Sequence, residues 1–373
     1  MKDEGPKRSA KQQEEHLMTH QARSREESSA GSTEGVRRTS SVTLSDVARL
    51  AGVSVSTASK ALNGRDQVRA ETRQRVLDTA ERLAFRPNPL ARGLLAGATG
   101  TVGLLTGDLE GRFSLPILMG AEDAFGAGEL SVFLCDARGD TIRERHHVRA
   151  LLDRRVDGLI VVGSSTDPRP SLGRDLPVPV VYVYAPSEDP ADLSFVPDNV
   201  AAGRMAVEHL IACGRTRIAH IAGAATYAAT TDRMKGIAAA LAEAGLEPAA
   251  ASHTGAWSER WGRAAAAMLL DQGTELDALV CGNDQIARGA VDTLRDLGRQ
   301  VPHDVAVIGF DDWHVVTEGC RPELTSLDMN LEQLGRNAAT ALAQAIADGS
   351  ALSGGVRTQT ARLVVRESTV PLT

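Results

Sequence analysis

The sequence predicts a small all-α domain with a helix-turn-helix, followed by a larger α/β domain made of two lobes with parallel sheets. Three observations predict this division. Three short helical segments lie within about 45 residues after Val42, and from residue 101 apolar runs alternate with amphipathic stretches of helical length. Repeated strand–helix units form parallel sheets that helices cover on both faces. This pattern spans about 270 residues, too many for one such sheet, so we expect two lobes.

The composition excludes several other classes of protein. Hydrophobic residues are 42% and charged residues 24% of the 373, which excludes a collagen-like or wholly disordered chain. No run reaches about 18 apolar residues and the N-terminus holds no apolar core, so neither a membrane-spanning helix nor a secretory signal is expected. Four widely separated cysteines without a CxxC pair argue against a zinc site or a disulfide framework and fit a reducing cytoplasm.

Charge is divided unequally along the chain. Residues 42–95 carry nine basic and five acidic residues, although the whole chain has a net charge of −7. A small basic segment joined to an acidic body indicates an anion-binding surface, while chance clustering of surface charge is the alternative. Residues 1–41 are rich in Ser, Thr, Glu, Gln and Arg, so a disordered tail is expected there.

The first ordered domain is expected over residues 42–87. Thr43 caps its first helix, with Asp46 placed as in a capping box, and a glycine ends that helix. The second helix covers residues 55–62. The third runs from about 71 to 83, with its apolar residues on one stripe.

The first two helices have the spacing of a helix-turn-helix that reads DNA. Ser54 and Thr57 stand near the start of the second helix, where hydroxyls and free amides can hold a phosphate. Val55, Ser56 and Lys60 project from its solvent face, which suits base edges in the major groove. The alternative is a helical hairpin that serves protein contacts.

A short hinge segment, residues 88–99, follows this domain. Asn88-Pro89 is a helix start, because proline is favoured at the first helical position. The helix is at most about two turns long and contains Gly93, so it should be mostly unfolded by itself.

The body, residues 100–370, alternates strands and helices. The strand-like runs are residues 101–106, 130–135, 158–163, 178–184, 218–222, 278–281 and 305–309. The helical stretches are residues 115–128, 141–154, 199–213, 231–245, 258–272 and 284–298. Ligands of doubly wound sheets bind beyond the carboxyl ends of the strands. We therefore expect a binding site in the loops after Thr106, Tyr184, Ala222, Cys281 and Gly309.

Several residues of these loops suit a small polar ligand. Arg233 offers donors in one plane, which suits vicinal hydroxyls or a carboxylate, and Asp311 can accept from hydroxyls. Asn283 both donates and accepts, and Trp257 can stack on the apolar face of a ring. Each has a structural alternative: a helix cap, a surface salt bridge or a core tryptophan.

The motifs VTLSDVARLAGVSVSTASKALNG, from residue 42, and RVLDTAERLAFRPNPLARGL, from residue 75, are highly specific. Further motifs are TVGLL, DNVAAGRMAVEHLIACGRTRIAHIAG, GNDQIARGAVDTLRDLG, VPHDVAVIGFDD and RPELTSLDMNLEQLGRNAA. Together they resemble the lactose-repressor (LacI/GalR) family of bacterial transcription regulators over roughly residues 42–370.

The resemblance implies a helix-turn-helix DNA-binding domain plus a two-lobed, periplasmic-binding-protein-like effector and dimerisation domain. It implies a homodimer that acts as a repressor in the family's usual manner and binds a near-palindromic duplex operator in the cytoplasm. A sugar-like effector would bind between the lobes, and no enzymatic activity, cofactor, metal or membrane is expected. The lobes are expected at about 101–198 plus 329–356, and at about 199–327 plus 357–370.

The resemblance also assigns residues. Bases would meet Val55, Ser56 and Lys60, and phosphates would be held by Thr43, Ser54, Thr57, Ser59 and Asn63. Leu94 corresponds to a hinge leucine that wedges into the minor groove, unless it only packs between domains. The effector would contact Phe113, Tyr184, Arg233, Trp257, Asn283 and Asp311. Asp198 lies at the crossing between lobes and would either touch the ligand or tie the hinge strands.

The chain also departs from the family pattern. Many relatives read NPFF where this chain has Gly111-Arg112-Phe113-Ser114, and Tyr184 and Met329 stand where polar residues are frequent. We therefore expect a ligand that is less polar than a simple sugar or differently shaped.

Two other classes of function are alternatives to a transcription regulator. A transport-type sugar-binding protein shares the two-lobed body, but it requires export and leaves residues 42–95 unexplained. A nucleotide-binding enzyme would need a phosphate loop, and neither GxGxxG after the first strand nor GxxxxGK[ST] is present. Asp311 and Asp312 are adjacent and should diverge, one toward ligand and one toward a structural partner. The C-terminus lacks leucine heptads, so a dimer is expected rather than a tetramer, and the sequence leaves open whether the ligand induces or co-represses.

Overall fold

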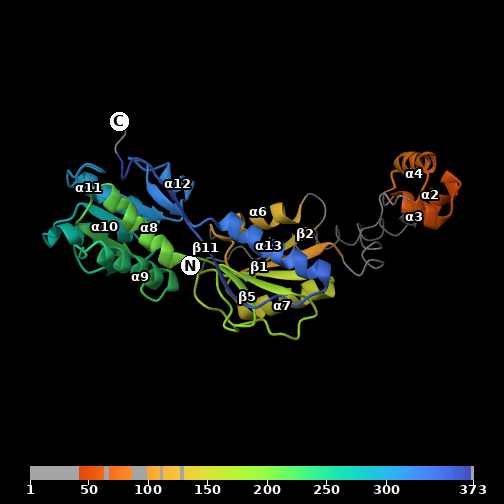
Figure 1. Ribbon diagram of the computed structural model, residues 1–373, viewed down its shortest axis with the longest axis horizontal. Coiled ribbons are helices and arrows are strands. Elements are labelled where there is room, and N and C mark those ends of the chain that lie inside the picture. The colour runs from red at the N-terminus through yellow and green to blue at the C-terminus, as the bar shows by residue number, and fades with distance from the viewer. Residues whose placement is uncertain (1–41, 63–66, 86–98, 110–111, 127–129, 371–373) are drawn as a thin grey trace, which may run out of the picture. The chain divides into compact units, whose positions relative to one another are not determined.

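The computed structural model describes residues 42–62, 67–85, 99–109, 112–126 and 130–370. The chain divides into two compact units, Met1–Pro87 and Asn88–Thr373 (Figure 1). The expected tail, most of the hinge segment, Asn63 and Leu94 lie outside the described residues.

The first unit contains the three predicted helices, α2 (Leu44–Ala51), α3 (Val55–Leu62) and α4 (Ala70–Arg82). Thr43 and Asp46 form the predicted capping box: Asp46 N donates to Thr43 Oγ1 at 3.3 Å, and Thr43 N donates to Asp46 Oδ2 at 3.1 Å. Gly52 ends α2 with φ of 66°, a left-handed conformation that glycine adopts without strain.

Small apolar side chains form the core of this unit. Its buried residues are Val47, Ala48, Ala51, Ala58, Ala61, Val68, Val76 and Ala80. The small alanine side chains allow the helices to approach closely, so these few residues fill the core between α2, α3 and α4. This packing fixes the angle between α2 and α3.

The first sheet of the second unit has the strand order β11-β5-β4-β3-β1-β2, and all its strands are parallel. The strands are β1 (Thr101–Thr106), β2 (Ser131–Asp136), β3 (Gly158–Val162), β4 (Val180–Val183), β5 (Leu193–Pro197) and β11 (Gly355–Gln359). Helices α6 (Ser114–Phe125) and α13 (Leu331–Asp348) cover one face, and α7 (Thr141–Asp153) lies on the other (Figure 1).

Both faces of the central strands β1, β3 and β4 are buried, which explains the unbroken apolar runs there, whereas the edge strands β2 and β11 are largely exposed. Val102 and Leu104 of β1 pack on the side of α6 and α13, whereas Leu105 packs with Val148 and Leu151 of α7.

The second sheet has the order β12-β10-β9-β8-β6-β7, in which only the β10–β12 pair is antiparallel. Its strands are β6 (Ile218–Ala222), β7 (His253–Thr254), β8 (Ala278–Cys281), β9 (Ala306–Phe310), β10 (Thr325–Asp328) and β12 (Arg362–Val364). Its helices are α8 (Asn199–Ala212), α9 (Ala228–Glu243), α10 (Glu259–Asp271), α11 (Asp284–Asp296) and α12 (His314–Thr317). The two predicted lobes of parallel sheet are thus confirmed.

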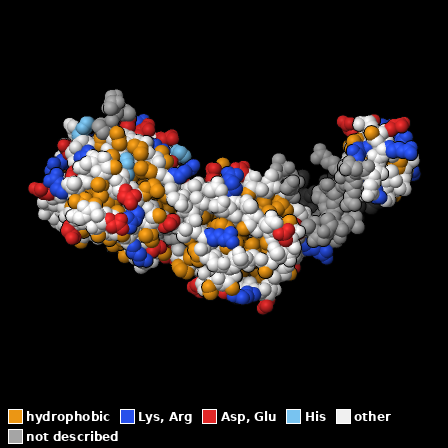
Figure 2. Space-filling view, in the orientation of Figure 1, with side chains coloured by type: hydrophobic (Ala, Val, Ile, Leu, Met, Phe, Trp, Pro, Cys, Tyr) orange, Lys and Arg blue, Asp and Glu red, His pale blue; other side chains and the backbone are white. Residues whose placement is uncertain are grey.

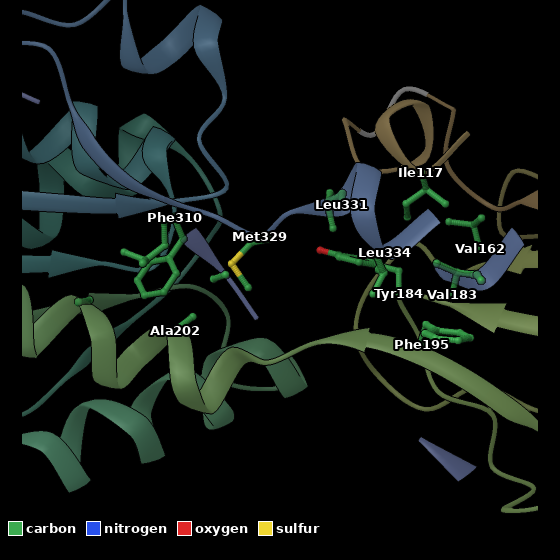
Figure 3. Close-up of a cluster of buried hydrophobic side chains, with 14 of the residues drawn as sticks. Ile117, Val162, Val183, Tyr184, Phe195, Ala202, Phe310, Met329, Leu331 and Leu334 are labelled. Carbon is green, nitrogen blue, oxygen red and sulfur yellow. The ribbon is translucent and has the colours of Figure 1, made fainter. Parts of the chain in front are cut away.

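The chain passes between the lobes after β5, after β10 and after β11. The sequence predicts that the last passage of the chain between the lobes lies near residue 356. Strand β11 pairs with β5 as far as Gln359, so the passage lies later in the chain. One apolar cluster includes residues of both lobes, such as Phe310 and Met329 on one side and Tyr184 and Leu331 on the other (Figure 3).

Candidate functional site

Helix α3 presents an open polar face in the first unit. Ala58 and Ala61 turn inward, while Val55, Ser56 and Ser54 are exposed and Lys60 is half-buried. The solvent face predicted from the sequence is therefore available to a partner.

The start of α3 is capped as predicted. Ser54 Oγ accepts a hydrogen bond from Thr57 N at 3.1 Å and lies 2.8 Å from Thr57 Oγ1. Thr43 is more constrained than the sequence suggested, because its hydroxyl donates to Asp46 Oδ2 at 2.7 Å. These bonds, with that of Arg49, lower the pKa of Asp46 to about 2.

The charge of the first unit is mixed. Figure 2 shows acidic side chains beside basic ones on its visible face. Its excess of basic residues is therefore an average over the unit and not one uniform positive surface.

The second unit has an ionic cluster at the carboxyl ends of strands from both lobes. Asp311 follows β9, and its Oδ2 accepts from Arg112 Nη2 at 2.9 Å. Its Oδ1 lies 3.4 Å from Arg233 Nη2. Arg112 comes from the first lobe and Arg233 from α9 of the second, so the Arg112–Asp311 pair joins the two lobes.

Arg233 is held by more than one partner. Its Nε donates to Asn199 Oδ1 at 2.8 Å, its Nη1 donates to the carbonyl of Gly282, and its guanidinium lies 4.4 Å from the centre of the Phe310 ring. The predicted ligand residue is therefore preorganised in a fixed orientation.

Aromatic rings line the first-lobe side of this cluster. Phe113 and Tyr184 stack with centroids 4.7 Å apart. Arg112 lies 5.2 Å from the Phe113 ring centre and 4.9 Å from that of Trp313. Burial and the charge of Asp311 raise the pKa of Tyr184, so its phenol stays protonated.

Two of these loop residues have unusual backbone geometry. Tyr184 and Asp311 have φ of 73° and 92°, in the region that disfavours residues with a Cβ. Such strain concentrates at sites where the surrounding structure fixes a functional side chain. Both residues directly follow a strand: Asp311 lies in a predicted ligand loop, whereas Tyr184 was predicted as the last residue of its strand, which ends at Val183.

Asn283 and Trp257 lie on the second-lobe side. Asn283 Oδ1 accepts from Ile286 N at 2.9 Å and so caps α11. A Cβ on Gly223 would lie 2.3 Å from the Trp257 ring, which shows how closely that ring lies on the end of β6. Within the described residues, Asn283 Nδ2 and Trp257 Nε1 are buried and have no hydrogen-bond partner.

Asp198 ties the crossing between lobes. Its Oδ1 accepts from Ala201 N at 2.9 Å, and its own N donates to the carbonyl of Gln359 at 2.9 Å. Two of the passages between lobes are thus bonded together at this residue. Asp198 therefore ties the strands that connect the lobes, which is one of the two roles expected for it. Its contact with a ligand stays a prediction.

The adjacent acids diverge as expected. Asp311 faces the two arginines, whereas Asp312 Oδ1 accepts from Arg366 Nη1 at 2.6 Å. A cavity of about 430 Å³ adjoins the cluster, and Arg112, Phe113, Asp311 and Trp313 contribute to its lining.

Sequence reasoning did not assign a role to four groups of the site. In the sequence, Arg112 is visible only as a departure from NPFF, and that departure is the available signal. Trp313 covers Arg112, and Asp167 Oδ1 accepts from Ala228 N at 2.7 Å across the lobes. Asp284 is fully buried, where it accepts from Ser326 Oγ and Trp313 N.

Sequence matches agree with both halves of this architecture. A profile for bacterial regulatory proteins of the lacI family matches residues 43–88, and a periplasmic binding protein-like domain matches residues 207–369. A helix-turn-helix unit joined to such a body defines a class of DNA-binding transcription regulators.

Curated relatives match along nearly the whole chain. Catabolite control protein A of Priestia megaterium is 33% identical over 79% of this chain and 89% of that protein. The transcriptional regulator CelR of Thermobifida fusca is 34% identical over 87% of this chain and 95% of that protein. The chain belongs to the LacI family of bacterial transcription regulators.

Solved structures show the same fold. The lac repressor dimer bound to operator and the anti-inducer ONPF is 27% identical, with a TM-score of 0.71, over 88% of this chain and 99% of that one. The CelR–cellobiose complex is 31% identical with a TM-score of 0.59 over the same shares. Among the described residues, no helix is long and apolar enough to cross a membrane, and no group of three or more His, Cys, Asp or Glu is placed to hold a metal.

Proposed function

We propose that this regulator is a cytoplasmic repressor that binds a near-palindromic operator as a homodimer and is controlled by a small molecule held between its lobes. The observation that carries the proposal is the ionic cluster of Arg112, Asp311 and Arg233, which lies in a two-lobed body on the same chain as an open helix-turn-helix. The operator-bound lac repressor dimer and the CelR–cellobiose complex support it by likeness.

In this proposal α3 enters the major groove. Val55, Ser56 and Lys60 read base edges, while Ser54, Thr57 and Ser59 hold phosphates with the free amides at the start of the helix. Thr43 contributes to a phosphate contact through the exposed start of α2, and Asn63 and Leu94 keep the roles that the resemblance assigns to them.

The effector binds among Phe113, Tyr184, Arg233, Trp257, Asn283 and Asp311. Loops from both lobes supply these residues, so a ligand that bridges them stabilises one arrangement of the lobes over another. The ligand changes operator affinity only by its difference in affinity for the two arrangements. A coupling of about 1–3 kcal/mol changes that affinity about 5- to 150-fold. No bound molecule is chemically converted in this role.

The experiment selects duplexes that the full-length protein binds from a random pool, then titrates the best duplex in the presence of individual sugars. We expect a two-fold symmetric consensus and at least one sugar-like molecule that shifts the affinity. Binding that shows no preference for any duplex over random competitor contradicts the DNA-reading role.

A further control tests the reading residues. Lys60→Ala should lower affinity for the consensus by about 1–3 kcal/mol and relax the preference at one base pair. Arg82→Ala, in the last turn of α4, is a charge-matched control that should keep the preference. Equal loss on every duplex for Lys60→Ala would place Lys60 on the phosphates instead.

A further inference from the structure

We propose that the cleft of this chain selects a polyhydroxylated ligand with one carboxylate, a sugar acid, and that Arg112 is the residue that selects the acid. The inference rests on the proposed function, because it names the class of ligand for the same cleft. Arg112 lies where many relatives have the proline of NPFF, so this cation is a feature of the chain itself.

The ionic cluster has one more positive charge than negative charge. Asp311 is the single carboxylate between two guanidiniums, at 2.9 Å from Arg112 and 3.4 Å from Arg233. The side chains are 19%, 6% and 4% exposed for Arg112, Asp311 and Arg233. A buried charge is costly unless an opposite charge accompanies it. A ligand that carries one negative charge would supply this counter-charge.

The neighbouring acids do not neutralise the cluster. Asp312 pairs with Arg366 at 2.6 Å. Asp284 is enclosed by Ser326 Oγ and Trp313 N, and burial raises its pKa, which favours the uncharged form. Asp108, near Tyr184, is half-exposed and therefore screened by solvent.

The unpartnered polar atoms of Arg112 and of the predicted ligand residues are donors. Within the described part of the chain, Arg112 Nη1, Asn283 Nδ2 and Trp257 Nε1 are buried and lack an acceptor. Ligand oxygens must therefore act as acceptors. An ionised carboxylate only accepts, which suits Arg112, whereas ligand hydroxyls can accept from the neutral donors.

Arg112 is held in place for this contact. Its guanidinium lies between the rings of Phe113 and Trp313, at 5.2 and 4.9 Å from their centres, and Phe113 is stacked on Tyr184. One guanidinium edge is used by Asp311 while Nη1 stays available, so the side chain can contact Asp311 and a ligand oxygen together. A phosphate dianion would exceed the single excess charge, so a carboxylate fits better.

The test uses matched pairs of neutral sugar and sugar acid on the full-length protein. The probes are D-glucose with D-glucuronate, D-galactose with D-galacturonate, and D-glucose 6-phosphate as the phosphate arm, with binding measured by isothermal titration calorimetry. We expect at least one acid to bind about 10- to 100-fold more tightly than its neutral partner, the range of a charge-assisted hydrogen bond.

Three variants identify the residue responsible. Arg112→Gln should reduce the affinity for the acid to that for the neutral partner, and Arg112→Lys should restore part of the preference, since it keeps the charge but loses the planar fork. Arg362→Gln removes the same charge from the lining of the same cavity, where Arg362 is 67% exposed and paired with Asp328. That control should keep the preference.

The outcomes separate this inference from the proposed function. Neutral sugars that bind as tightly as the acids and shift operator affinity would leave the proposed function standing and overturn the acid preference. Tighter binding of glucose 6-phosphate, or equal losses in Arg112→Gln and Arg362→Gln, would also overturn it. If none of the probes binds, the proposed effector class and the inference fall together.

Discussion

Asp284 is a residue whose burial has a measurable pH signature. It is fully buried, and burial together with the charge of Asp311 raises its pKa well above the usual value. The folded state then holds a proton that the unfolded chain releases above about pH 4, so this residue makes folding less stable as pH rises. An asparagine keeps one of the two oxygens that accept from Ser326 Oγ and Trp313 N, and it removes the titrating proton.

We therefore expect the stability of Asp284→Asn relative to the wild type to rise as pH increases above about 4, the usual pKa of an aspartate in the unfolded chain. Melting temperatures of both proteins over that range measure the gain. A difference that stays constant with pH would mean that Asp284 is ionised in the folded state.

Gly223 is a residue fixed by close approach. Its added Cβ would lie 2.3 Å from Trp257 ring atoms, so Gly223→Ala should displace the tryptophan and cost about 1–3 kcal/mol in the free energy of unfolding. Gly107→Ala is the matched control, because its Cβ would meet nothing closer than 3.5 Å. Urea unfolding of the two variants measures the difference, and equal stabilities would show that the Trp257 ring yields without cost.

At the scale of elements, the capping box sets the start of α2. Thr43→Ala removes the side-chain acceptor for Asp46 N and should cost about 1 kcal/mol of local stability. Hydrogen exchange of the amides in residues 44–51, followed by mass spectrometry, should then be several-fold faster, while exchange in α11 of the other unit stays unchanged. Unchanged exchange in α2 would show that core packing alone holds its first turn.

The same box is pH-dependent. The pKa of Asp46 is lowered to about 2, so its contribution is complete above the unfolded value near 4 and is lost as pH falls toward 2. Exchange in α2 should accelerate over that interval, once corrected for intrinsic rates, in the wild type more than in Thr43→Ala.

Strands that form an unbroken apolar run could be predicted from sequence, whereas β5 and β10 are buried but interrupted by Ser, Thr or Pro and were not predicted. Strands β1, β6 and β8 have the predicted bounds because every residue but the first of β1 is buried, which leaves an unbroken apolar run. Strand β11 is largely exposed, so its sequence has no such run, and it was not assigned. Helix α13 was also missed as an element, although its motif contributed to the resemblance.

The site shows the same limit. Arg233, Asn283, Trp257 and Asp311 can be singled out from sequence because each lies in or near a segment that follows a predicted strand, and their contact with a ligand stays a prediction. The Arg112–Asp311 bond joins residues 199 positions apart. A local sequence pattern cannot predict such a pair, because the contact depends on how the two lobes pack against each other.

At the scale of the whole molecule, the two binding functions should respond differently to salt. Contacts to phosphates release counterions, so operator affinity should fall about 10³-fold or more between about 50 and 200 mM salt. Ligand binding to the buried cluster should change far less, because buried charges are screened weakly. Operator titrations and calorimetry over one salt series test this, and equal slopes would contradict the assignment of DNA contacts to exposed charge.

The apolar cluster that both lobes share constrains how such a body can be re-engineered. A chimera that takes one lobe from a relative would need side chains that pack against the retained part of this cluster around Phe310, Met329 and Leu331. Packed side chains tolerate few changes of volume. Most of the loop residues beyond the strands lie outside this cluster, with Tyr184 as an exception. New ligand preferences are thus most readily obtained by grafting loops and keeping the apolar cluster between the lobes unchanged.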